Sequence, residues 1–257
     1  MKIIIKTKEE IGILKEGGKR LAFIVDTLAK ETKAGMSTWD LEERALELIA
    51  EGGDIPAFLN YRPEGAPTPF PCALCVSVNS EIVHGIPKKE TILKNGDVVS
   101  IDCGLKHKGL FTDHATTVIV GEGTKVTREL LQVTKESLMA GIAMAKVGNK
   151  TGDIGYAVSA VVRPHGFGVV RELAGHGVGK HIHEDPYIPN YGKNGAGVLL
   201  QPGMVIAIEP MITIGKPDIV SLSDGYTIKT ADGSKSAHFE HTVAITEDGP
   251  IILTELE

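Results

Sequence analysis

The sequence contains only three cysteines, Cys72, Cys75 and Cys103, among 257 residues. Three thiols cannot form a disulfide framework in a chain of this size, and they suit the reducing cytosol. Hydrophobic runs are also short: the first, Ile3 to Ile5, is too short for a signal peptide, and none approaches the roughly twenty residues of a membrane span. The sequence therefore predicts a cytoplasmic protein that does not enter a membrane.

Positive charge is scarce. Lysine and arginine number 27 against 33 acidic residues, which gives a net charge of −6. Binding to nucleic acid needs a concentrated cationic face, so no specific nucleic-acid partner is expected. With 42% hydrophobic and 23% charged residues the chain has globular composition, which excludes disorder. The acidic excess is compatible with a cation site.

The Cys72-x-x-Cys75 pair is interpreted as structural, because a zinc or redox site would need a second such pair or a strand–CxxC–helix context. Hydrophobic periodicity predicts an α/β protein. We expect helices near residues 8–33, 39–50, 128–146 and 153–162, and strands near 73–78, 98–105, 111–120, 204–214, 226–229 and 238–246. Four prolines make residues 62–71 a loop.

Three landmarks recur in the same order along the chain. Residues 33–41 return as 146–154, residues 93–102 return as 200–209, and Asp113-His114 returns as Glu240-His241. A repeat of this length indicates two similar α/β halves rather than a solenoid. We expect a single catalytic domain over residues 1–257, with halves of roughly 1–122 and 123–257. Packing about a pseudo-twofold axis would bring the matching carboxylates face to face.

Asp102 and Asp113 are expected on neighbouring strands. A hairpin centred between His107 and Lys108 would make them direct cross-strand partners about 5 Å apart, an arrangement that is destabilising without a cation between them. Two solvated aspartates near a loop are the alternative. Glu209 and Glu240 each lie in an apolar strand with no adjacent Lys or Arg, where an unpaired charge costs several kcal/mol. Structural ion pairing is the alternative to a shared cation.

Histidines complete the pattern. His176 and His183 lie in or next to the glycine-rich segment 175–179, whose missing side chains allow close approach of backbone and ligand, and His84 ends a strand before a Gly-x-Pro turn. One imidazole with four carboxylates is a donor set for Mn, Co, Fe(II) or Zn, and shared carboxylates can hold two ions a few Å apart. Each histidine taken alone could equally be a satisfied polar residue.

In their order and spacing, these motifs together resemble type I methionine aminopeptidase: His84-Gly-Ile-Pro, Asp102 with Asp113, Gly-His176-Gly-Val-Gly, His183-Glu-Asp-Pro, Ile-Glu209-Pro and Phe-Glu240-His-Thr. The resemblance spans nearly the whole chain and implies the pita-bread fold, in which two pseudo-twofold-related halves enclose a dinuclear site. It implies one ion on Asp102, Asp113 and Glu240, and another on Asp113, His176, Glu209 and Glu240. The implied cofactors are two divalent ions, of Co, Mn, Fe(II), Zn or Ni.

The resemblance also implies roles for residues near the metals. Glu209 would accept the proton of the attacking water, while His84 and His183 would contact the substrate and take part in catalysis. Phe70, Cys75, Ile182 and Tyr226 would line the methionine pocket. Leu173, Ile182 and Tyr226 stand where relatives usually carry other residues, and the 62–71 loop is unusual, so the detail of this pocket is expected to differ.

The implied activity is removal of the initiator methionine from nascent proteins when the second residue is small and uncharged. The partners would be nascent N-termini, at the ribosome, and the enzyme would be a monomer. Only 25 residues separate His183 from Glu209, which leaves no room for the insertion of type II enzymes. An Xaa-Pro peptidase of the same fold is one alternative, although such enzymes usually carry a long N-terminal domain and only 83 residues precede His84. A non-catalytic pita-bread binding protein is another, although such proteins typically lose ligands that are retained here.

Overall fold

The computed structural model describes residues 3–63, 65–66 and 68–256; positions 64 and 67 of the expected loop at 62–71 lie outside this part of the chain. The four expected helices are confirmed to within a few residues. They are α1 (Lys8–Glu31), α2 (Thr38–Glu51), α3 (Lys125–Ala143) and α4 (Thr151–Val162), followed by a short 3₁₀ helix, η1 (Arg163–His165). Within the described residues, none of these helices combines the length and the apolar character needed to cross a bilayer.

The helices begin where their capping residues predict. Thr7 caps α1 in a capping box with Glu10, and Ser37 caps α2 in a second box with Asp40. In each box the side chain of the cap accepts a hydrogen bond from the third helical N–H, and the acidic side chain accepts one from the N–H of the cap.

In the part of the chain that the structure describes, the strands form three sheets in which every pairing is antiparallel. The large sheet has the order β1-β4-β5-β14-β9-β7-β8, with β2 also paired to β4 and β15 to β14, and the small sheets are β13-β10-β6 and β11-β12-β3. Their bounds are β1 (Ile55–Pro56), β2 (Leu74–Val78), β3 (Glu81–Val83), β4 (Val98–His107), β5 (Leu110–Ile119), β6 (Gly168–Val169), β7 (Ala174–Gly177), β8 (Glu184–Pro189), β9 (Val205–Ile208), β10 (Met211–Thr213), β11 (Ile219–Ser221), β12 (Ile228–Thr230), β13 (Ser236–His238), β14 (Glu240–Thr246) and β15 (Gly249–Ile252).

Two of the expected strands are interrupted, which corrects the sequence interpretation. The expected strand 204–214 divides into β9 and β10 at Glu209-Pro210, and the expected strand 238–246 is preceded by β13, with Phe239 between β13 and β14. Pro210 has no N–H to donate to a ladder. The paired strands β9 and β14 of the large sheet end at these residues. Beyond them the same two chain segments pair again, as β10 and β13, in a small sheet. Both glutamates therefore lie where a strand changes sheet.

The repeated sequence segments form matching local structures. Gly35 N–H donates to the carbonyl of Leu93 at 2.9 Å, and Gly148 N–H donates to the carbonyl of Leu200 at 3.3 Å. Both glycines have positive φ, 90° and 89°, a conformation that glycine adopts without steric cost. Each contact joins the start of a helix, α2 or α4, to the segment that leads into a central strand of the large sheet, β4 or β9.

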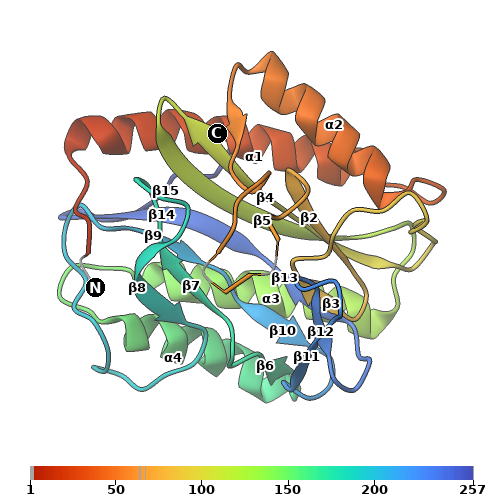
Figure 1. The fold of residues 1–257 in the computed structure, drawn as a ribbon. Coiled ribbons are helices and arrows are strands. Elements are labelled where there is room, and N and C mark those ends of the chain that lie inside the picture. The colour runs from red at the N-terminus through yellow and green to blue at the C-terminus, as the bar shows by residue number, and fades with distance from the viewer. Residues whose placement is uncertain (1–2, 64, 67, 257) are drawn as a thin grey trace.

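Helices cover the large sheet from two sides. In Figure 1, α1 and α2 lie along the upper edge of the molecule and α3 and α4 along the lower edge, with the curled sheet between them. One apolar cluster joins α1 and α2 to β2 and β4, and a second joins α3 and α4 to β9 and β14. These two clusters fix the strands whose residues form the site described below.

One buried carboxylate links α2 to the sheet. Glu42 is 2% exposed and accepts hydrogen bonds from the N–H groups of Ala73 and Leu74, at 2.7 and 2.9 Å. Its pKa is raised because burial penalises the charged form, although both N–H groups act in the opposite direction. The carboxylate thus satisfies two donors at the start of β2.

We expect Glu42→Ala to destabilise the protein by about 2 kcal/mol or more, because it leaves two buried N–H groups without an acceptor. In a chain of this size that corresponds to a fall in Tm of roughly 5 °C. Thermal unfolding followed by circular dichroism measures it. Glu43→Ala is the matched control, because Glu43 is exposed. Equal Tm values for the two variants would contradict the anchoring role of Glu42.

Candidate metal centre

The β4–β5 hairpin presents two aspartates, but its register differs from the one expected. Asp102 lies opposite Ala115 and Asp113 opposite Gly104, so the two are not direct cross-strand partners. The turn is formed by residues 108–109, both with positive φ (47° and 88°), which moves its centre one residue along the chain. The register therefore shifts by two residues, and an even shift leaves both aspartates on the same face.

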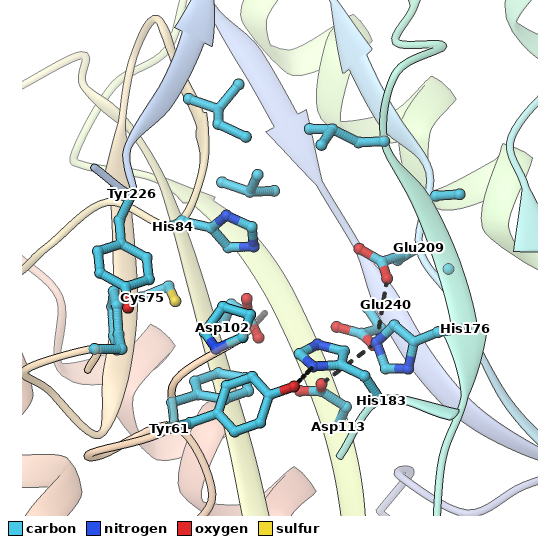
Figure 2. A pocket seen from close by; sticks show the side chains of 18 of the residues that line it. Tyr61, Cys75, His84, Asp102, Asp113, His176, His183, Glu209, Tyr226 and Glu240 are labelled. Atoms are coloured by element: carbon cyan, nitrogen blue, oxygen red, sulfur yellow. Dashed lines mark hydrogen bonds and ion pairs between the residues drawn. The ribbon is translucent and has the colours of Figure 1, made fainter. Parts of the chain in front are cut away.

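The other three expected ligands come from neighbouring strands of the large sheet. Glu240 begins β14 and lies opposite Ala115, Glu209 directly follows β9, and His176 lies in β7. Figure 2 shows the five side chains converging on one region at the floor of a cavity. Ligand atoms within 4.8 Å of one another form three groups: Asp102 with Asp113 and Glu240; His176 with Glu209 and Glu240; and Asp113 with His176 and His183.

The four acids are almost completely buried. Asp113 and Glu240 are 3% and 2% exposed, and one oxygen each of Asp102 and Glu240 has no hydrogen-bond partner within the described residues. Burial raises the pKa of Asp102 to about 7. Burial, followed by repulsion from the neighbouring acids, raises the pKa of Asp113 and Glu240 well above their usual values. The cluster therefore favours protons or a cation over free carboxylates.

Two imidazoles are the nearest basic groups to these acids. His176 Nε2 lies 3.6 Å from Glu209 Oε1 and 3.8 Å from Asp113 Oδ2, and His238 Nε2 lies 3.3 Å from Glu209 Oε2. Burial alone would lower the pKa of His238, but its contact with Glu209 outweighs burial and raises it. These contacts are longer than strong charge-assisted hydrogen bonds, so pairing within the site does not account for four buried acids.

His238 was not among the site residues expected from the sequence. The signal was present, because His238 and Glu240 are two residues apart and alternate residues of an extended chain face the same side. Tyr61 was also absent from the expected site. Its hydroxyl lies 2.9 Å from His183 Nδ1, and the two rings are 5.1 Å apart. No sequence pattern indicates this contact, because it joins a loop to a residue more than a hundred positions away.

His183 and His84 both line the cavity, and a nitrogen of His183 also lies within 4.8 Å of ligand atoms of Asp113 and His176. His183 packs edge-on against His176 with ring centroids 4.5 Å apart, and His84 lies across the cavity from Glu209 in Figure 2. Both rings remain partly open to solvent, yet the surrounding protein displaces enough water to lower their pKa values, that of His183 to about 3. Both are neutral at physiological pH. His84 has a φ of 58°, a left-handed conformation that non-glycine residues adopt uncommonly and that is found at some ligand-binding and active sites.

Above the acids lies a cavity of about 600 Å³. Phe70, Cys75 and Tyr226 line it as expected, and the rings of Phe70 and Tyr226 meet edge to face at 5.1 Å. Its further apolar lining comes from several elements and includes Phe58, Tyr61, Val83, Leu173, Met211 and Ile228. The remaining expected residue, Ile182, does not line the cavity. It is 3% exposed and packs in the core against Gly104, because the turn before β8 directs its side chain inward.

The close approach of backbone expected at the glycines around His176 is confirmed. A Cβ atom on Gly175 would lie 2.2 Å from the carbonyl oxygen of Ala207, and one on Gly177 would lie 2.2 Å from that of Asp185. These glycines allow β7 to pack closely against the neighbouring backbone. Close approach of a ligand at the same glycines stays a prediction.

The donor set fits divalent cations. Four carboxylates and one imidazole are oxygen and nitrogen donors suited to hard or borderline divalent ions. The partnerless oxygens of Asp102 and Glu240 and the raised pKa values of the acids are what such an ion would relieve. The arrangement supports hydrolytic chemistry, in which a bound ion activates water and polarises a carbonyl.

Comparison with known proteins agrees with this chemistry. The model of metallopeptidase family M24 matches residues 12–247. A methionine aminopeptidase of Aquifex aeolicus is 45% identical over 258 residues and covers all of both chains. The crystal structure of a methionine aminopeptidase from Thermotoga maritima matches with a TM-score of 0.94 at 45% identity, over 99% of this chain and 100% of the other. A prolidase from Pyrococcus furiosus matches with a TM-score of 0.75 at 26% identity, over 99% of this chain but 66% of the other. These matches confirm the expected pita-bread fold.

We expect divalent ions to stabilise the protein, because they offset the repulsion among its buried acids. Addition of Mn²⁺ to chelator-treated protein should raise its Tm by several degrees, measured by calorimetry. Glu240→Gln should lose most of this increase, because it removes a charge shared by two of the three groups of ligand atoms. The control is Glu247→Gln, at an exposed position in the turn between β14 and β15. An undiminished Mn²⁺ response in Glu240→Gln would contradict the assignment.

Proposed function

The chain belongs to metallopeptidase family M24, and we propose that it is the enzyme that removes the N-terminal methionine from newly made proteins whose second residue is small and uncharged. The observation that carries this proposal is the position of the buried acids and His176 at the floor of an apolar cavity. A peptide whose first side chain fills the cavity would have its first amide bond next to the metal ligands. Full-length similarity to methionine aminopeptidases supports the choice of methionine.

The site is proposed to hold two divalent ions. One would be held by Asp102, Asp113 and Glu240, and the other by Asp113, His176, Glu209 and Glu240, an assignment supported by two of the three groups of converging ligand atoms. The third group contains His183, which we assign to the substrate because its ring faces the cavity. Mn, Co, Fe(II), Zn and Ni all suit this donor set, so availability would decide the working metal. Bound ions would supply activation of water and polarisation of the scissile carbonyl.

Protein side chains would position the substrate and move protons. Glu209 is the proposed acceptor of the water proton and its donor to the leaving amine, because its carboxylate lies at the cavity floor beside His176 and His238. Neutral His183 would hydrogen-bond the scissile peptide group, with Tyr61 donating to Nδ1 so that Nε2 carries the proton. His84, on the opposite side, would accept a hydrogen bond from the N–H of the scissile amide.

The apolar part of the cavity would receive the methionine side chain. Phe70, Cys75 and Tyr226 form one wall, and the hydroxyl of Tyr226 donates to the carbonyl of Thr68 in the proline-rich loop. The thiol of Cys75 is neutral, because burial raises its pKa well above the usual value. The wall is therefore uncharged, as a thioether side chain requires.

The two alternatives to this function are an Xaa-Pro peptidase and a non-catalytic binding protein. An Xaa-Pro peptidase of the same fold would use the same metal ligands, but the similar prolidase has about a third of its chain beyond the matched part. A non-catalytic binding protein would retain the cavity without turnover. As partners we propose nascent N-termini at the ribosome, and for the enzyme a monomeric state in the cytoplasm.

The decisive experiment supplies metal-free protein with Mn²⁺, Co²⁺, Fe²⁺, Zn²⁺ or Ni²⁺ and with the peptides Met-Ala-Ser-Lys, Met-Lys-Ser-Ala and Ala-Pro-Ser-Lys. We expect release of methionine from the first peptide alone, detected by mass spectrometry, because a long second side chain would collide with the cleft. Cleavage of Ala-Pro in preference to Met-Ala would favour the Xaa-Pro peptidase. Binding of Met-Ala-Ser-Lys without turnover under every metal would favour the binding protein.

His183→Ala should lower kcat by about a hundredfold or more with a smaller change in KM, because the lost contact strengthens in the transition state. Metal stoichiometry, measured by inductively coupled plasma mass spectrometry, should stay at the wild-type value. Loss of one ion in this variant would make His183 a ligand instead.

Tyr61→Phe should lower kcat by about three- to tenfold, because the ring packing against His183 remains while the hydrogen bond to Nδ1 is lost. Its metal content should not change. Steady-state kinetics on Met-Ala-Ser-Lys measures the effect, with Tyr156→Phe as an exposed control on α4. Wild-type kcat in Tyr61→Phe would show that the hydroxyl does not orient His183.

A further inference from the structure

The N-terminal segment reaches the turn that carries His183. Residues 3–7 run in extended form ahead of α1, and the N–H of Lys6 donates to the carbonyl of Gly203 at 2.8 Å. The side chain of Lys6 then enters the protein, where Nζ lies 2.5 Å from Glu184 Oε2 and 3.1 Å from the carbonyl oxygen of Ile4. The side chains of Lys6 and Glu184 are only 1% and 2% exposed, so this is a buried ion pair.

Glu184 uses its other oxygen to close the turn before β8. Oε1 accepts hydrogen bonds from the N–H groups of Lys180 and His181, the latter at 2.9 Å. His183 is the residue directly before Glu184, and its ring reaches from this turn to Tyr61 and His176. The geometry of the turn therefore determines where the imidazole of His183 lies.

Gly179 makes room for the lysine. A Cβ atom at this position would lie 2.4 Å from Cε of Lys6, and the φ of Gly179 is 140°. On the other side of the segment, a Cβ on Gly203 would lie 2.7 Å from Cγ2 of Ile5. The final glycine of the Gly-His-Gly-Val-Gly motif is thus explained by the passage of Lys6 beneath the turn.

We propose that Lys6 is a positioning residue for His183, acting through Glu184 and the turn at residues 180–184. Without the ammonium group, a carboxylate whose side chain is only 2% exposed would be held by backbone N–H groups alone, a costly state that favours rotation of the Glu184 side chain away from the turn. The N–H groups of Lys180 and His181 would then lose their acceptor. The turn would relax and His183 would move away from Tyr61. This inference rests on the proposed function of His183.

The test is a double-mutant cycle between Lys6 and His183. Lys6→Met should lower kcat on Met-Ala-Ser-Lys by about tenfold, with metal stoichiometry unchanged, and Lys6→Arg should restore most of the activity by keeping the charge. In a His183→Ala background, Lys6→Met should change kcat by less than about twofold, because the residue that it positions is gone. Lys30→Met is the control: it breaks an ion pair with Asp26 in which the lysine is 74% exposed.

A second readout needs no metal and no turnover. In metal-free protein labelled with ¹⁵N-histidine, the His183 ring signals, assigned from the His183→Ala spectrum, should shift in Lys6→Met and stay in place in Lys30→Met. If Lys6→Met does not fold, the double variant Lys6→Met/Glu184→Ala removes both buried charges together with the acceptor of the turn, and the His183 signals should shift in it as well.

The inference is overturned if the fold-changes in kcat from Lys6→Met and His183→Ala multiply in the double mutant, or if the His183 signals do not shift in Lys6→Met. Lys6 would then be a stabilising residue only. Failure of the proposed function gives a different result. The wild type would not release methionine, while the ring signals of His183 would still report whether Lys6 positions it.

Discussion

The burial of four carboxylates within a few Å of one another is the constraint on which this structure depends. Apolar side chains alone would fill the same volume at lower cost, since each buried acid must give up water and face its neighbours. Five strands of one sheet nevertheless bring Asp102, Asp113, His176, Glu209 and Glu240 together. Hydrophobic clusters on both sides of the sheet hold those strands, so the packing of the helices opposes the repulsion at the centre. A divalent ion converts that repulsion into attraction.

The two glutamates show how the fold aims its ligands. Each lies where the chain passes between the large sheet and a small one: from β9 of the large sheet to β10, and from β13 of the small sheet to β14. A residue in mid-ladder would have its side chain direction fixed by the pleat. At a change of sheet the backbone turns, so Glu209 and Glu240 can both be directed toward the pair on β4 and β5. Pro210, which donates no hydrogen bond, makes the first of these changes compatible with a satisfied backbone.

Much of this arrangement was predictable from the sequence, and the failures have physical causes. Helix caps and apolar periodicity predicted four helices, and the acids stood out because they interrupt apolar strands. The hairpin register was wrongly predicted because Lys108 adopts a positive φ. The neighbouring Gly109 is the one local indication of this conformation in the sequence. The position of Ile182 was wrongly predicted because a turn sets the direction of its side chain. Glu184 closes this turn by accepting from its N–H groups, and Glu184 is itself paired with Lys6, far away in the sequence. Tyr61 and the short strand β6 are fixed by long-range contacts that leave no local pattern.

The expected metal ligands come from strands that are far apart in the sequence, so metal binding would affect how easily the strands of the large sheet separate. Asp102 and Glu240 come from opposite halves of the sequence, and no strand lying between them in the sheet can separate from its neighbours without breaking the cluster. Metal ions bound by these residues would together link β4, β5, β14, β9 and β7. Their binding would slow the opening of central backbone hydrogen bonds far from any ligand, so that amide exchange in these strands would record whether the protein carries metal.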